Sequence, residues 1–208
     1  PYASALSTLV DDEAEMGVAC IDMGGGTTSV GVFQRGRLVH CDAVAVGGNH
    51  ITMDLARGLS LRLEDAERIK NLNCSCMESV SDDREQLRVH QVGEDARDYP
   101  TQIPRSYATR IIKPRVEEIL ELVRDRLQKA GFALNAGQRV VLTGGAAQIA
   151  GLPDLARLIL TKHVRIGRPV GIQGLPEAAK SPAFATAVGL LVYPQVAALA
   201  HFEPTRGR

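Results

Sequence analysis

A short apolar run that ends on a carboxylate and leads into three consecutive glycines constrains this chain more than any other feature. Val18–Asp22 has the composition of a buried strand, and Met23-Gly-Gly-Gly-Thr-Thr28 follows it directly. Glycines permit a tight backbone reversal because they lack a Cβ atom. Val30–Phe33 then resumes the β pattern, and Leu38–Val46 supplies a third strand beyond a second turn. Residues 18–46 therefore predict an antiparallel meander of three strands.

An amphipathic pattern governs the middle of the chain. Apolar residues recur at helical spacing from Val116 to Leu127, which predicts a helix that begins at Lys113 and has Gly131 as its C-cap. The other predicted elements are helices at 2–9, 49–55 (with Asn49 as N-cap), 63–69, 152–163 and 182–193, strands at 87–92, 139–143 and 164–166, and a loop over the acidic run 11–15. This order predicts an α/β fold, a mixed sheet with helices on its faces, and an inserted lobe within residues 60–110.

Charge and hydropathy exclude two classes of partner. The chain has 24 basic and 24 acidic side chains, so there is no global basic field of the kind that drives nucleic-acid or membrane adsorption. The longest apolar stretch, Ala183–Tyr193, is shorter than the roughly 18–20 residues that a membrane span needs. The chain opens with Pro-Tyr-Ala-Ser and shows no signal-peptide pattern, so we expect it to be cut from a longer protein.

Four cysteines indicate the redox environment. Only Cys74 and Cys76 lie close together, and a C-x-C pair lacks the second ligand pair that a zinc site needs. We therefore expect reduced thiols in a cytosolic protein, with Cys20 and Cys41 buried in strands.

The first glycine cluster is suited to phosphate. Successive backbone N–H groups without side chains form a concave anion site, which predicts phosphate contacts from Gly24, Gly25, Gly26, Thr27 and Thr28. Asp22 would repel a bare polyphosphate, so the sequence predicts that this carboxylate acts through Mg²⁺, by way of a water, as the catalytic and metal-binding residue. The alternative is a plain hairpin turn, and the motif by itself does not decide between the two.

A second glycine cluster strengthens the phosphate interpretation. Gly144, Gly145 and Ala146 follow another apolar strand, and two such turns can close on one nucleotide from opposite sides. Alone, this second cluster is an ordinary strand-to-helix loop. Glu67 and Lys70, on one helical face, are predicted to hydrogen-bond a ribose; the alternative is a solvated i, i+3 salt bridge.

These motifs carry a resemblance. Residues 22–28 resemble the second phosphate motif of the actin-like ATPases, and Val141–Leu152 resembles their adenosine motif. Pro1–Leu6 and Ser181–Leu191 resemble the two helices that connect the lobes of that fold. The fuller strings, among them Gly47-Gly-Asn49 with Thr52, Asp65–Lys70 and Val164–Gly167, resemble the FtsA family of bacterial cell-division proteins within that superfamily.

The resemblance implies the second lobe of an actin-like, ribonuclease H-like ATPase fold. Subdomain IIA would comprise residues 1–50 and 132–195, with connecting helices at 1–9 and 182–193, subdomain IIB residues 51–131, and a tail residues 196–208. It implies ATP and Mg²⁺ as ligands, at most weak ATPase activity in the full-length protein, and an inactive isolated lobe. Ser29 departs from the family, which commonly has Asp there. A lobe of a metabolic kinase of the same superfamily is the alternative, although no residue here stands out as its general base.

The resemblance also implies partners and a location. Members of this family bind the C-terminal peptide of FtsZ, self-associate into filaments and recruit other division proteins at the cytoplasmic face of the inner membrane, at the division septum. Their membrane anchor is a terminal amphipathic helix that this chain lacks. Lys113 and Arg115, at the predicted start of the long helix, are the expected peptide contacts, because cations there oppose the helix dipole and so favour an anionic partner. Merely solvated basic residues are the alternative.

Overall fold

A mixed five-stranded sheet forms the centre of the molecule. The computed structural model describes residues 1–93, 99–132, 139–161, 163–170 and 172–196, and the predicted tail falls outside these ranges except for Val196. The strands are β1 (Val18–Met23), β2 (Thr28–Gln34), β3 (Arg37–Val44), β4 (Gln86–Val89), β5 (Thr101–Pro104), β6 (Arg139–Thr143) and β7 (His163–Ile166). The helices are α1 (Tyr2–Thr8), α2 (Asp11–Met16), α3 (Gly48–Leu59), α4 (Leu63–Leu72), α5 (Arg105–Lys129), α6 (Leu152–Ile159) and α7 (Ala185–Val196).

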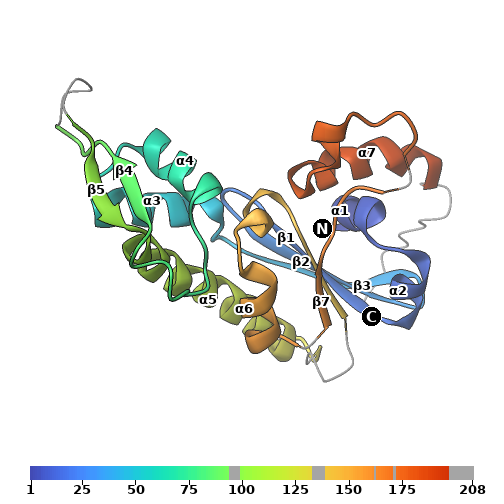
Figure 1. Ribbon diagram of the computed structural model, residues 1–208. Coiled ribbons are helices and arrows are strands. Elements are labelled where there is room, and N and C mark those ends of the chain that lie inside the picture. The colour runs from blue at the N-terminus through green and yellow to red at the C-terminus, as the bar shows by residue number, and fades with distance from the viewer. Residues whose placement is uncertain (94–98, 133–138, 162, 171, 197–208) are drawn as a thin grey trace.

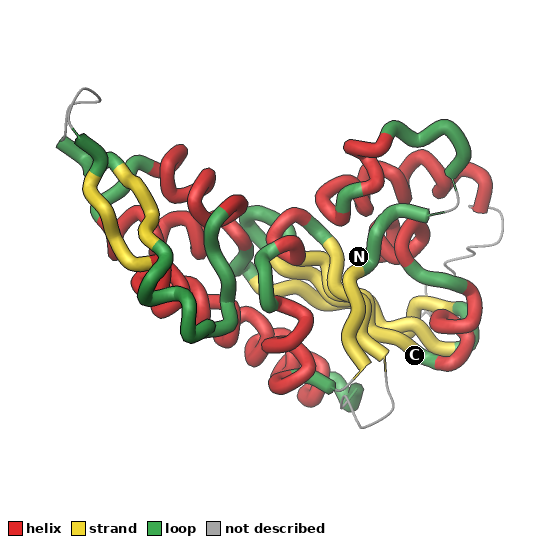
Figure 2. The backbone as a smooth tube through the Cα atoms, viewed as in Figure 1, coloured by secondary structure: helices red, strands yellow, loops and turns green. Residues whose placement is uncertain are grey.

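The sheet order is β3-β2-β1-β6-β7 (Figure 1). β1, β2 and β3 pair antiparallel, which confirms the predicted meander, whereas β6 and β7 join β1 in parallel. Parallel pairing requires a long crossover, and the chain between β3 and β6 supplies it with α3, α4, the β4–β5 hairpin and α5. α3, α4 and the β4–β5 hairpin extend away from the sheet, whereas α5 runs from the hairpin back to the sheet (Figures 1 and 2).

Alternating side chains of β1 divide the core between the two faces of the sheet. Ala19, Ile21 and Met23 belong to the large cluster that includes the apolar side of α5. Val18 and Cys20 belong to a smaller cluster with Ala5 of α1. This separation follows from the two-residue period of a strand, and it decides the direction in which Asp22 points.

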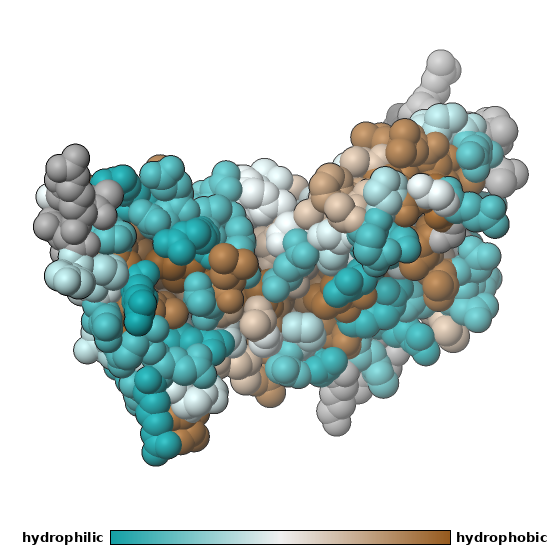
Figure 3. Space-filling view, turned by 45° about the horizontal axis from the view of Figure 1, so that its top comes forward, coloured by the Kyte–Doolittle hydropathy of each residue, from teal (hydrophilic) through white to brown (hydrophobic). Residues whose placement is uncertain are grey.

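α1 covers the second face of the sheet, and α7 packs on α1. α1 and α7 cross at a buried glycine, Gly189, and Ser7 Oγ donates to the backbone oxygen of Ala185 at 2.7 Å. Leu190 and Leu191 of α7 are exposed. Figure 3 shows that apolar surface gathers at the end of the molecule where α7 lies. None of the helices in the described ranges has both the length and the apolar character that crossing a bilayer demands.

Several predicted boundaries are wrong. The acidic run is a helix, α2, because Glu13 turns inward to Arg165 of β7 instead of into solvent. α3 extends to Leu59 and is capped at Gly47, whose N–H donates to His50 Nδ1, so Asn49 lies inside the helix. β3 ends at Val44, β4 at Val89 and α6 at Ile159, and β5 was not predicted.

The cysteines are free thiols, as expected, but the burial of Cys41 was predicted wrongly. Cys41 is exposed because β3 is an edge strand whose side chains alternate between partly covered and solvent-facing positions. The three buried cysteines are Cys20, Cys74 and Cys76, and burial raises the pKa of each to about 12.

Candidate functional site

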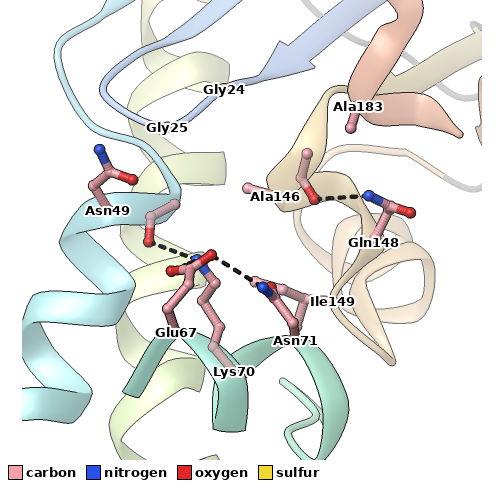
Figure 4. A pocket seen from close by; sticks show the side chains of 12 residues that line it. Gly24, Gly25, Asn49, Glu67, Lys70, Asn71, Ala146, Gln148, Ile149 and Ala183 are labelled. Carbon is pink, nitrogen blue, oxygen red and sulfur yellow. Dashed lines mark hydrogen bonds and ion pairs between the residues drawn. The ribbon is translucent and has the colours of Figure 1, made fainter. Parts of the chain in front are cut away.

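A cavity of about 430 Å³ opens where β1 and β6 end (Figure 4). The two glycine turns that follow these strands lie on opposite sides of it, and α4 closes it from a third side. The lining residues are Gly24, Gly25, Gly48, Asn49, Glu67, Lys70, Asn71, Gly145, Ala146, Gln148, Ile149 and Ala183. The fold thus brings together two turns that are about 120 residues apart in the sequence, as the phosphate interpretation requires.

The first glycine turn is clamped against the start of α3. Gly48 N donates to Gly24 O at 2.9 Å, and Asn49 N donates to Gly25 O at 2.8 Å. A Cβ atom on Gly47 would lie 2.5 Å from Gly24 O and 2.7 Å from Gly25 O, so only glycine fits there. Because the turn uses these first amides of α3, a ligand must be bound by other donors.

Amides without an acceptor occur in both glycine turns. In the described part of the chain, the backbone N–H groups of Gly25, Gly26 and Gly145 donate to no residue. Gly25 and Gly145 both line the cavity. A cavity flanked by unused, side-chain-free amides attracts anions, since each amide is a partial positive charge that otherwise needs water.

Lys70 and Glu67 form a network at the α4 side of the cavity (Figure 4). The side chain of Lys70 is only 5% exposed, and its ammonium donates to Glu67 Oε2 at 2.6 Å, Thr52 Oγ1 at 2.9 Å and Gly48 O at 3.3 Å. These three bonds use all the N–H groups of the ammonium. The salt bridge foreseen as the alternative exists, but it is not solvated at its lysine end.

Glu67 is the exposed partner of this network. Burial tends to raise its pKa, but hydrogen bonds from Lys70 and Thr52 outweigh that effect and hold the pKa below its usual value. Its carboxylate is 45% exposed and lines the cavity, where it accepts a further bond from Asn71 Nδ2 at 3.1 Å. Both residues predicted to contact a ribose line the cavity, and the hydrogen bond from Lys70 holds Glu67 in place.

Asp22 lies outside the lining of the cavity, on the α7 side of β1. Its Oδ2 accepts a hydrogen bond from Thr186 Oγ1 of α7 at 2.7 Å. Its Oδ1 lies beside Gly144, where an added Cβ would approach it to 2.5 Å. The φ of Gly144 is +90°, so glycine is required there for conformation as well as for space.

The donor set allows one mode of metal binding. No cluster of three or more His, Cys, Asp or Glu side chains that suits a metal occurs among the described residues. Mg²⁺ keeps several waters and is commonly held by one or two carboxylates together with ligand phosphates, so a single carboxylate at Asp22 fits that ion. Ser29, directly opposite Asp22 on β2, adds no second charge.

Besides Asp22 and Gly144, three further predicted site residues do not line the cavity. Gly26 has no atom within 4 Å of the place where a Cβ would stand. Thr27 accepts a hydrogen bond from Gly24 N through its backbone oxygen at 2.9 Å. Thr28 is buried, and its hydroxyl donates to Val46 O at 2.8 Å, so it anchors the meander.

Sequence reasoning missed the side-chain amides and two of the side-chain hydroxyls at the site. Asn71 and Gln148 line the cavity, while Thr52 and Thr186 hold Glu67 and Asp22. Asn71 stands four residues after Glu67 on α4, a spacing at which helical side chains meet, so this contact had a signal. The contact of Thr186 with Asp22 had no such signal, because 164 residues separate the two along the chain.

The predicted position of Lys113 and Arg115 is wrong. α5 begins at Arg105, so both residues lie well inside the helix, and the argument from the helix dipole does not apply to them. Lys113 Nζ donates to Glu78 at 3.1 Å. Arg115 is bidentate to Asp54, at 2.6 and 3.2 Å, and also pairs with Glu118.

Comparison with solved structures supports the fold. MreB 5 of Spiroplasma citri bound to AMPPNP matches with a TM-score of 0.69 at 19% identity, over 95% of this chain and 58% of that one. A double helical filament of MamK matches with a TM-score of 0.63 at 16% identity, over 94% of this chain and 58% of that one. The fold is therefore actin-like, as predicted.

Sequence comparison identifies the family. The model described as "Cell division protein FtsA" matches residues 19–189. The cell division protein FtsA of Rhizobium meliloti is 59% identical over 96% of this chain and 45% of its own length, and that of Escherichia coli K12 is 37% identical over 92% and 46%. The chain thus spans about half the length of the curated relatives it matches. These matches favour the cell-division family over the metabolic kinases, and the chain belongs to the FtsA family of actin-like cell division proteins.

Proposed function

We propose that this chain supplies one half of a Mg-ATP site in a cell-division scaffold of the FtsA type. The observation that carries the proposal is the pairing of two glycine turns with unused amides across one cavity. The match to MreB 5 bound to AMPPNP supports a nucleotide as the ligand. In the full-length protein, the scaffold would link FtsZ filaments to the inner membrane at the division septum, self-associate, and recruit other division proteins.

Each residue of the site would bind a different part of Mg-ATP. Amides of Gly25 and Gly145 hydrogen-bond phosphate oxygens, Glu67 accepts from ribose hydroxyls, and Asp22 holds Mg²⁺ through a water. Bound Mg²⁺ neutralises phosphate charge. No described side chain at the cavity combines the position and the free acceptor that a base for activating water needs. We therefore propose at most weak ATPase activity in the full-length protein, and none in this chain alone.

Nucleotide titration followed by NMR tests the proposal. Half of a site should bind ATP weakly, with a dissociation constant on the order of millimolar. Gly145→Val puts a side chain beside the cavity, where the added Cβ meets only Ala183, at 3.9 Å, and circular dichroism of the variant checks that it folds. We expect this variant to lose binding.

Ala178→Val is the matched control, because Ala178 is exposed on another 3₁₀ turn and does not line the cavity. Its affinity for ATP should equal that of the wild type. Shift changes in the wild type that avoid both glycine turns would contradict the assignment of the site.

We also propose that residues 51–131 dock the C-terminal peptide of FtsZ. A hollow of about 290 Å³ between α3 and α5 supports this, since it combines apolar Ile111 and Pro114 with Arg115. Asp54 and Glu118 already neutralise Arg115, so a peptide carboxylate must compete with them. Lys113 pairs with the exposed Glu78 and does not line this hollow, so we expect it to contribute less than Arg115.

Fluorescence anisotropy with a labelled FtsZ tail peptide tests this docking. Arg115→Ala should weaken peptide binding roughly tenfold, which is the scale of one charge-assisted hydrogen bond. Lys113→Ala should weaken peptide binding less than Arg115→Ala. The cost to folding should stay within about 1 kcal/mol, since the broken ion pairs are partly exposed. Equal affinity of wild type and Arg115→Ala at low salt would dismiss Arg115 as a contact.

A further inference from the structure

The direction of the Asp22 side chain is set by β1. Asp22 shares the face of Val18 and Cys20, which pack beneath α1, and not the face that packs on α5. Its side chain therefore points toward the two terminal helices, and there its Oδ2 accepts the hydroxyl hydrogen of Thr186. The carboxylate proposed to hold the metal is thus bonded to α7 and not to its own loop.

The start of α7 is fixed to both strand ends. Gly144 N donates to Pro182 O at 3.1 Å, and Thr143 Oγ1 lies 3.4 Å from the same oxygen. One turn later, the Thr186 hydroxyl donates to Asp22 at the end of β1. The segment leading into α7 therefore follows the ends of β1 and β6, which carry the two glycine turns.

α7 is in turn locked to α1. At Gly189 there is no room for a Cβ atom against the Ala3 backbone, and Ser7 Oγ bonds to Ala185 O. Tyr193 also meets Tyr2 edge to face, with ring centroids 6.2 Å apart. A displacement of α7 thus carries α1 with it.

We propose that Thr186 is a positioning residue for Asp22, and that through it metal binding at Asp22 is coupled to the α1–α7 pair. This inference rests on the proposed nucleotide site. The Thr186 hydroxyl occupies Oδ2 and fixes the rotation of the carboxylate, so that Oδ1, beside Gly144, is the oxygen left for a metal-bound water. Mg²⁺ gives up its waters reluctantly, so an acceptor for such a water must be held at one place. By linkage, the factor by which a docked α7 strengthens Mg²⁺ binding at Asp22 is also the factor by which Mg²⁺ favours the docked state of α7.

Two substitutions isolate the hydroxyl. Thr186→Val keeps the shape of the side chain and removes the donor, whereas Thr186→Ser keeps the donor and removes the methyl group. Affinity for ATP is measured by NMR titration with and without MgCl₂ on the wild type and both variants. Thr186→Val should reduce the gain in affinity due to Mg²⁺ about threefold to tenfold and leave the affinity without Mg²⁺ unchanged. Thr186→Ser should behave as the wild type.

Hydrogen exchange gives a readout independent of affinity. Saturation with ATP and Mg²⁺ should slow amide exchange in α7 of the wild type and of Thr186→Ser, but not of Thr186→Val. Ala187→Val, at the neighbouring exposed position, controls for an added β-branched side chain and should retain the slowing.

The outcomes separate the two proposals. A wild type that binds no ATP under either condition overturns the nucleotide site, and the role of Thr186 with it. If the wild type gains affinity for ATP with Mg²⁺ and Thr186→Val gains as much, the nucleotide site stands and only the role of Thr186 is refuted. If Thr186→Ser loses the gain as well, the methyl group and not the hydroxyl is responsible, and the inference is wrong.

Discussion

The crossing of α1 and α7 predicts a large cost for one added methyl group. Gly189 is buried in α7 against the backbone of Ala3, and an alanine Cβ would lie far inside the roughly 3.5 Å at which non-bonded atoms pack. The two helices must separate, and the 2.7 Å bond from Ser7 to Ala185 would break. Overpacking costs roughly 1–3 kcal/mol, the lost hydrogen bond about 1 kcal/mol, and alanine returns about 1 kcal/mol of helix propensity. We expect Gly189→Ala to lower the free energy of unfolding by roughly 1–3 kcal/mol.

Urea unfolding followed by circular dichroism measures this difference. Gly26→Ala is the matched control, because no atom lies within 4 Å of its added Cβ and its φ is not left-handed. The control should be neutral or stabilised by up to about 1 kcal/mol, since alanine restricts the unfolded chain. If Gly189→Ala proves as stable as Gly26→Ala, the helices are not in the close contact described, and the coupling argument for Asp22 loses its support.

Two further predictions concern titration and thiols. The pKa of Glu13 is lowered by its hydrogen bonds to Arg165 despite burial, so its contribution to stability is present above the unfolded pKa and is lost as pH falls through the folded one. Between about pH 6 and about pH 3, Glu13→Gln should therefore lose less free energy of unfolding than the wild type in denaturant titrations. At about pH 8, a colorimetric thiol reagent should react rapidly with Cys41 alone, because the three buried cysteines, with a pKa of about 12, stay protonated. Rapid reaction of more than one thiol per folded chain would contradict the burial described.

Local patterns predicted the sheet well. The meander, β6 and the long helix were found because strand and helix periods are written into neighbouring residues. The start of α5 was missed because the apolar spacing that predicted the helix was traced only from Val116, whereas the helix begins at Arg105. α2 was missed because six residues carry little periodic signal, and its only buried charge, Glu13, is explained by Arg165, 152 residues away.

The sequence predicted which backbone turns meet at the cavity, but not how the polar side chains around it pair. Glycine runs reveal where the chain must approach something closely, and both runs line the cavity. The ribose contact of Lys70 stays a prediction. The protein partners of its side chain were not predictable: Lys70 lines the cavity, and its ammonium donates all its hydrogens to Glu67, Thr52 and Gly48. Such saturation depends on how α3 and α4 pack, which a linear pattern does not encode.

The alternation of side chains along β1 explains why the carboxylate lies two residues before the first glycine. Met23 must point into the core beneath α5, because the strand alternates and Ile21 already points there. Asp22 then points to the opposite face, where α7 offers a hydroxyl, and Gly24 begins the turn. Moving the carboxylate by one residue would bury an unpaired charge among apolar side chains, which costs far more than a misplaced ligand. The spacing of the motif is therefore imposed by the sheet as much as by any ligand, and the same alternation that stabilises the core delivers Asp22 to Thr186.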